Sequence, residues 1–110
     1  MTEVNIYRDK AGRIVKYKVE GHTGAGAEGN DIVCAAVSAV TQAAIVGLEE
    51  VAGIKPKIRV RNGYLECEVP QLEGQKRERA DVILETMFLS VKNLQEQHGK
   101  FLKVIEIFKV

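Results

Sequence analysis

The 110-residue chain is long enough for one compact domain and too short for two, so we expect a single domain over residues 1–110. Its 16 Lys and Arg against 15 Asp and Glu give a net charge of +1, so no global field attracts nucleic acid or a membrane. The opening sequence MTEVNIYRDK lacks the apolar core of a signal peptide, and the two cysteines are therefore expected as reduced thiols in the cytoplasm.

The first part of the chain predicts a β-hairpin. Residues 3–8 and 14–20 alternate between polar and apolar side chains, and the turn-forming sequence DKAG separates them. Val15, Tyr17 and Val19 are expected to face the core, because alternate residues of a strand share one face.

A long apolar helix is predicted next, from about residue 31 to residue 52. Asp31 suits the N-cap position, and Gly53 suits the C-terminal stop. The uncharged run 32–48 falls short of the roughly 20 apolar residues that a membrane span requires, so we expect a buried helix. Its many alanines favour cover on more than one side.

The second half of the chain predicts another hairpin and a second helix. The turn Asn62-Gly63 joins predicted strands at 57–61 and 64–69. A polar linker, 71–76, then leads into a helix that ends near Gln97 and has apolar residues at helical spacing.

The final run, residues 101–110, has apolar residues on both faces, which favours a central strand. The predicted order is ββαββαβ. We therefore expect an α+β fold in which a mixed or antiparallel sheet of about five strands carries two helices. On the second helix, Val82 and Leu89 point away from the apolar stripe, which indicates either a homodimer contact or two ordinary exposed residues.

The segment between the first hairpin and the first helix contains GAGAEG, residues 24–29, with the G-x-G-x-x-G spacing of a dinucleotide-binding loop. That motif works where a parallel strand leads into a helix, whereas this strand belongs to an antiparallel hairpin. Glu28 and Asp31 would also place carboxylates where phosphate oxygens should lie. We therefore expect no nucleotide, and we interpret three glycines as the source of a mobile loop: Gly24, Gly26 and Gly29.

The same segment brings a histidine and a cysteine to the helix start. With Asp31 as N-cap, Cys34 falls in the first turn, where unpaired N–H groups and the helix dipole favour a thiolate and can stabilise an oxyanion. His22 can serve as the base, and Ser38 lies on the same helix face as Cys34. Residue types and spacing alone leave two interpretations open: a catalytic Cys–His pair, or a buried cysteine beside a solvated histidine.

The remaining cysteine and histidine do not extend this site. Cys67 lies on the apolar face of its strand and is expected in the core, whereas His98 closes the second helix. Together with Cys34 and His22 they lack a recognisable zinc-ligand spacing, so we expect no metal and no other cofactor.

Gly21-His22, a glycine-containing loop and DIVCAAVS at residues 31–38 resemble the ribosomal-processing cysteine protease family (Prp). The resemblance extends over the whole chain, including the opening hairpin, residues 85–87 and the last strand. One difference concerns the loop, because residues 23–29 are small apart from one glutamate, where family loops often carry bulkier side chains.

The resemblance implies a cytoplasmic cysteine endopeptidase with Cys34 as nucleophile and His22 as base, supported by Gly21, Asp31 and Ser38. The implied substrate is the precursor of a large-subunit ribosomal protein, whose N-terminal extension is cut after a pair of aromatic residues. The family also implies a homodimer with a mobile loop over the site. No membrane and no direct nucleic-acid contact are expected. The alternative is a non-catalytic ribosome-associated module that only binds the peptide.

Overall fold

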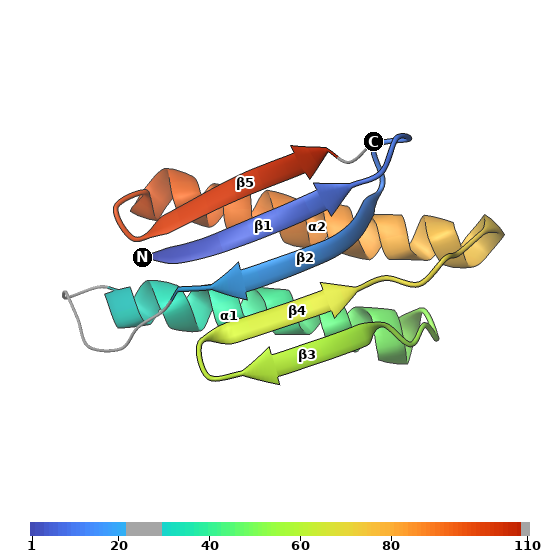
Figure 1. Cartoon of the computed structure of the whole chain (residues 1–110), viewed down its shortest axis with the longest axis horizontal. Helices are drawn as coiled ribbons and strands as arrows, with labels where there is room; N and C mark the ends of the chain where they lie inside the picture. The colour runs from blue at the N-terminus through green and yellow to red at the C-terminus, as the bar shows by residue number, and fades with distance from the viewer. Residues whose placement is uncertain (22–29, 109–110) are drawn as a thin grey trace.

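The computed structural model describes residues 1–21 and 30–108, which form a five-stranded sheet with helices on one face (Figure 1). The order confirms the predicted ββαββαβ arrangement and the α+β class. The elements are β1 (Thr2–Arg8), β2 (Ile14–Glu20), α1 (Asn30–Val46), the π-helix η1 (Gly47–Val51), β3 (Lys57–Arg61), β4 (Tyr64–Glu68), α2 (Gly74–His98) and β5 (Leu102–Phe108).

The strand order is β3-β4-β2-β1-β5, with β5 parallel to β1 and the other neighbours antiparallel. The prediction of a central last strand is wrong, because β5 lies at an edge of the sheet that these residues form. β2 already occupies one side of β1, so the crossover through α2 delivers β5 to the other side. Ile105 and Ile107 pair with Asn5 and Tyr7 and are half-buried there, on the face opposite to the core residues of β1.

At one position of β2, the residue that is buried differs from the residue that was predicted to face the core. The pairing shifts between Tyr7 and Arg8, so that Arg8 pairs with Ile14 and a bulge falls at Val15. Ile14 is therefore fully buried, and Val15, which was expected to face the core, is half-buried. Tyr17 is fully buried as predicted.

Helix α1 begins at Asn30, so Asp31 lies inside the first turn and the prediction of Asp31 as N-cap is wrong. The helix continues as the π-helix η1 through Val51, close to the predicted end at residue 52. Helix α2 begins at Gly74, within the predicted polar linker, and ends at His98, next to the predicted end.

The expectation of a buried first helix holds for one face of α1. Val33 and Val37 of α1 and Leu48 of η1 are buried in the core, whereas Ile32 is 72% and Val46 is 56% exposed. By length and composition alone the segment Asp31–Val51 is apolar enough to cross a membrane, but core helices of globular proteins pass the same test. The alanines favoured cover on a second side of this helix, but no element within the described chain covers that side.

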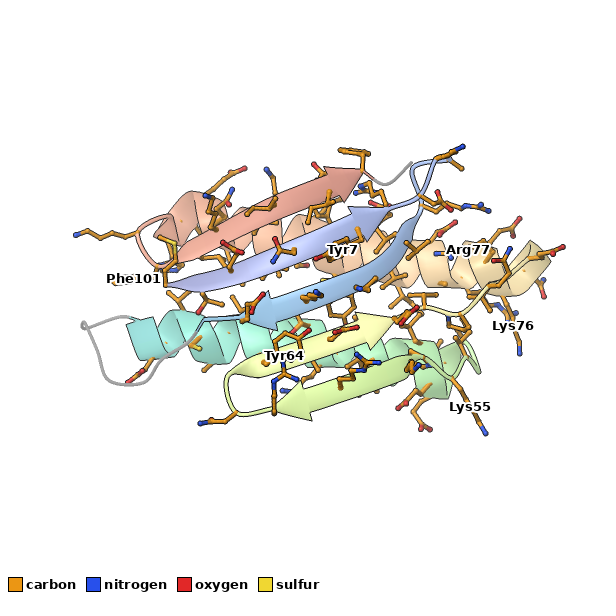
Figure 2. All side chains as sticks on the ribbon, in the orientation of Figure 1. Tyr7, Lys55, Tyr64, Lys76, Arg77 and Phe101 are labelled. Atoms are coloured by element: carbon orange, nitrogen blue, oxygen red, sulfur yellow. The ribbon has the colours of Figure 1, made fainter. Side chains whose placement is uncertain are left out.

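The opposite face of the sheet carries polar and aromatic side chains. Figure 2 shows Tyr7 and Tyr64 on this face, turned away from the helices. Lys16 and Lys18 lie over the ring of Tyr7, and the hydroxyl of Tyr64 donates to Glu66. The helices and the site described below therefore share the other face.

Arg8 joins β1 to α2 and β5 on the helix side. Its guanidinium donates to both carboxylate oxygens of Glu85, at 2.6 and 3.0 Å, and to Glu106 at 2.8 Å. The group also lies 4.9 Å from the ring centroid of Phe88. These carboxylates raise the pKa of Arg8, although its burial acts in the opposite direction. These contacts hold β1 in place, and the first residue of β1 lines the site described below.

Candidate active site

Cys34 is half-buried and lies in the wall of a groove of about 520 Å³ between α1 and strands β2, β3 and β4. The sulfur is therefore not sealed inside the core. Ser38, one helical turn later, lines the same groove, which confirms that the two residues share a face of α1. The groove thus offers a thiol to any molecule that occupies it.

The groove is mainly apolar. Val60 on the edge strand β3 is 70% exposed, and Val46 on the facing side of α1 is 56% exposed. Glu20 and Arg61 add charged groups to the wall. The apolar side chains of the wall are Val19, Ile45, Val46, Ile58, Val60 and Leu65. Such a surface fits an extended segment with large apolar side chains.

Thr2 contacts the sulfur from a different element. Its hydroxyl donates to the Sγ of Cys34 at 3.6 Å, and the side chain is 1% exposed. Sequence reasoning missed Thr2, because 32 positions separate it from Cys34 and no motif connects them. Only the position of β1 above the start of α1 brings the two together (Figure 1).

Gly21, one of the supporting residues that the resemblance implies, follows β2 with φ of +89°, a conformation that L side chains rarely adopt. A Cβ at this position would lie 2.7 Å from the main-chain oxygen of Met1. Glycine is therefore required twice over, by its dihedral angle and by the close approach of the N-terminal residue.

The described residues include two further predicted site residues, Asp31 and Ser38. Asp31 is exposed in the first turn of α1, and the Oγ of Ser38 accepts a hydrogen bond from Gln42 at 2.8 Å. The predicted base His22 and the loop glycines lie outside the described residues: Gly24, Gly26 and Gly29.

The position of Cys34 in the helix also differs from the prediction. Cys34 lies four residues after Asn30, the first residue of α1, so the N–H of Cys34 is paired within the helix with a main-chain oxygen one turn earlier. Its amide is therefore not one of the unpaired donors. The side chain of a helical residue leans toward the helix N-terminus, so the sulfur points toward the first turn, whose N–H groups have no helical partner.

A buried hydrogen bond sets the distance of α1 from the sheet. The hydroxyl of Tyr17 on β2 donates to the main-chain oxygen of Thr41 at 2.7 Å, and both residues are fully buried. Burial raises the pKa of Tyr17 far above its usual value, so the phenol stays a donor. This bond holds the helix that carries Cys34 against the strand that leads to Gly21.

Cys67 is fully buried on β4, as predicted, and burial raises the pKa of its thiol to about 11. It therefore stays protonated at neutral pH. His98 is the last residue of α2, as expected. No cluster of three or more His, Cys, Asp and Glu side chains suited to a metal ion occurs in the part of the chain that the structure describes.

An enzyme that uses a sulfur nucleophile needs an accessible thiol beside a cavity for its substrate, and these two features occur together at Cys34. The fold and site therefore define the class of thiol enzymes. A sequence model of the family described as cysteine protease Prp matches residues 1–103, and the chain belongs to that family. It is a cysteine protease, and this membership decides against the non-catalytic alternative.

Individual relatives agree with this assignment. The chain is 28% identical over 107 residues to the ribosomal processing cysteine protease Prp of Bacillus subtilis, covering 94% of this chain and 96% of the relative. It is 25% identical over 104 residues to the protein of the same name from Staphylococcus aureus, covering 94% and 97%.

Solved structures show the same fold. A crystal structure of SMU.848 from Streptococcus mutans matches with a TM-score of 0.84 and 26% identity, covering 99% of this chain and 96% of that one. The ribosomal processing protease Prp from S. aureus, crystallised with a substrate peptide, matches with a TM-score of 0.83 and 23% identity over 99% and 100% of the chains.

Proposed function

We propose that this chain is a cytoplasmic, single-domain endopeptidase that removes the N-terminal extension of a large-subunit ribosomal protein by a Cys34–His22 dyad. The observation that carries the proposal is the half-buried thiol of Cys34 in the wall of an apolar groove, in a member of the cysteine protease Prp family. The relatives from B. subtilis and S. aureus carry the name of ribosomal processing proteases, which supports the substrate class.

In the proposed reaction, His22 takes the proton of Cys34 and the sulfur attacks the carbonyl carbon of the scissile peptide bond. First-turn N–H groups of α1 stabilise the resulting oxyanion. The C–N bond then breaks, and the imidazolium gives its proton to the leaving amine, which leaves a thioester on Cys34. Water, deprotonated by His22, adds to the thioester, and breaking the C–S bond releases the new carboxyl end and restores the thiol.

The groove supports a substrate with large apolar side chains next to the cut. Its volume of about 520 Å³ and its aliphatic walls suit one or two aromatic rings, in agreement with cleavage after a pair of aromatic residues. The glycine loop that follows Gly21 is proposed to close over the bound segment, and Gly21, Asp31 and Ser38 to support the site.

The test is to incubate the protein with the ribosomal-protein precursor and to sequence the new N-terminus. Cys34→Ala and His22→Ala are each expected to abolish cleavage while the thermal unfolding midpoint changes little. Cys67→Ala serves as the matched cysteine control, because the Cys67 thiol is buried away from the groove, and it is expected to cleave normally. Turnover by either dyad variant at the unaltered rate would refute the mechanism.

We also propose a homodimer through the exposed face of α2. Val82 is 69% and Leu89 is 63% exposed, and their spacing of seven residues places them on one helix face. Light scattering is expected to give twice the chain mass of 12.2 kDa, with Leu89→Lys shifting it to the single-chain mass. A single-chain mass for the unaltered protein at every concentration would rule the dimer out.

A further inference from the structure

A buried hydroxyl is aimed at the sulfur of Cys34 from outside its helix. Thr2 is 1% exposed and its Oγ1 donates to Sγ at 3.6 Å, and both residues line the same groove. No resemblance or motif assigns a role to this residue. The contact joins the first residue of β1 to the second turn of α1, so it depends wholly on the tertiary structure.

The sheet holds this donor in place. The main-chain N–H of Thr2 donates to the oxygen of Phe101 at 2.9 Å, and Thr2 pairs in register with Leu102 of β5. Val4 and Ile6, at alternate positions of β1, are fully buried on the same face. Because threonine is branched at Cβ, few χ1 rotamers remain once its backbone is fixed. Little conformational entropy is therefore lost when the hydroxyl donates to the sulfur during the reaction.

The chemistry of the contact favours the ionised sulfur. A hydroxyl that donates to a thiolate makes a charge-assisted hydrogen bond, which is stronger than one to a neutral thiol. At a site withdrawn from water such a donor replaces part of the lost hydration of the anion. The same bond restricts the rotation of the Cys34 side chain, which keeps the sulfur at the groove wall.

We propose that Thr2 is a positioning residue of this protease, whose hydroxyl fixes the Cys34 sulfur at the groove and stabilises its thiolate form. The inference rests on the proposed function of Cys34 as nucleophile. It adds an N-terminal strand residue to the proposed nucleophile on α1.

The test compares Thr2→Val, which keeps the side-chain shape, with Thr2→Ser, which keeps the hydroxyl. The rate of alkylation by iodoacetamide is measured at Cys34 by peptide mass spectrometry between pH 5 and 10. Loss of a hydrogen bond to a charged group corresponds to roughly a tenfold change, so we expect Thr2→Val to react about tenfold more slowly at pH 7. Thr2→Ser, which keeps the hydroxyl, is expected to restore the rate of the unaltered protein.

Thr86→Val is the matched control, because Thr86 is an exposed residue of α2 whose hydroxyl donates to the main-chain oxygen of Val82. It is expected to leave the alkylation profile of Cys34 unchanged. Where Thr2→Val does not fold, Thr2→Ala is compared with Thr2→Ser, since these side chains differ by the hydroxyl alone. Folding is checked by the protection of buried Cys67 from the same reagent.

In cleavage assays Thr2→Val is expected to lower kcat about tenfold and to change KM less than about twofold, because the lost contact acts on the sulfur and not on the bound peptide. An unchanged alkylation profile in the folded hydroxyl-less variants would overturn the role of Thr2, whatever the protease activity. Alkylation needs no peptide, so absence of cleavage by the unaltered protein would instead count against the proposed function.

Discussion

Replacing Gly21 by alanine tests whether the N-terminal residue fixes the entrance to the catalytic loop. The φ of +89° disfavours an L side chain by about 1–2 kcal/mol, and the less flexible unfolded chain offsets about 0.4–1 kcal/mol of that cost. The new Cβ also approaches the main-chain oxygen of Met1 to 2.7 Å. This oxygen belongs to the backbone and cannot rotate away, so the chain must move, at a cost of about 1–3 kcal/mol.

Gly12→Ala is the matched control, because Gly12 has a similar φ of +84° and nothing lies within 4 Å of its Cβ position. We expect Gly12→Ala to lose about 1 kcal/mol of unfolding free energy, and Gly21→Ala about 2–4 kcal/mol. Urea denaturation measures both values. Gly21→Ala is also expected to lose most precursor cleavage, since His22 follows it directly. Equal stability and equal activity of the two variants would refute the reasoning.

Arg8→Met is expected to lower the unfolding free energy by about 2 kcal/mol, because it leaves the carboxylates of Glu85 and Glu106 without their cationic partner. The partial exposure of both carboxylates limits the loss. Urea denaturation measures the change, and an unchanged midpoint would contradict this expectation. Stability is expected to fall as pH rises from 9.0 toward about 11, because the raised pKa of buried Cys67 lets the unfolded chain release that proton first. The decline should be shallower in Cys67→Ala, and an equally steep decline would argue against this cause. Val60→Lys is expected to raise KM about tenfold or more, because it places a charge in the apolar wall of the groove. Val51 is 75% exposed and lies outside the groove, so Val51→Lys is expected to leave KM unchanged. Equal KM values for the two variants would show that the groove is not the binding site.

Local chemistry made several elements predictable from the sequence. The Asn62-Gly63 turn specifies the β3–β4 hairpin, in which Arg61 pairs with Tyr64 across two residues. Helical periodicity identified α2 and placed Cys34 and Ser38 on one face of α1. These features depend on neighbours a few positions apart, so a single sequence contains the information for them.

The edge position of β5, the burial of Ile14 and the contact of Thr2 with Cys34 could not be predicted in this way. An apolar strand looks alike at the edge and at the centre, and the bulge that buries Ile14 depends on how β1 pairs with β2. The sequence by itself determined the order of the elements and the residue types that resemble a protease. Tertiary structure alone decided which side chains surround the sulfur, because pairing between strands distant in the chain sets those distances.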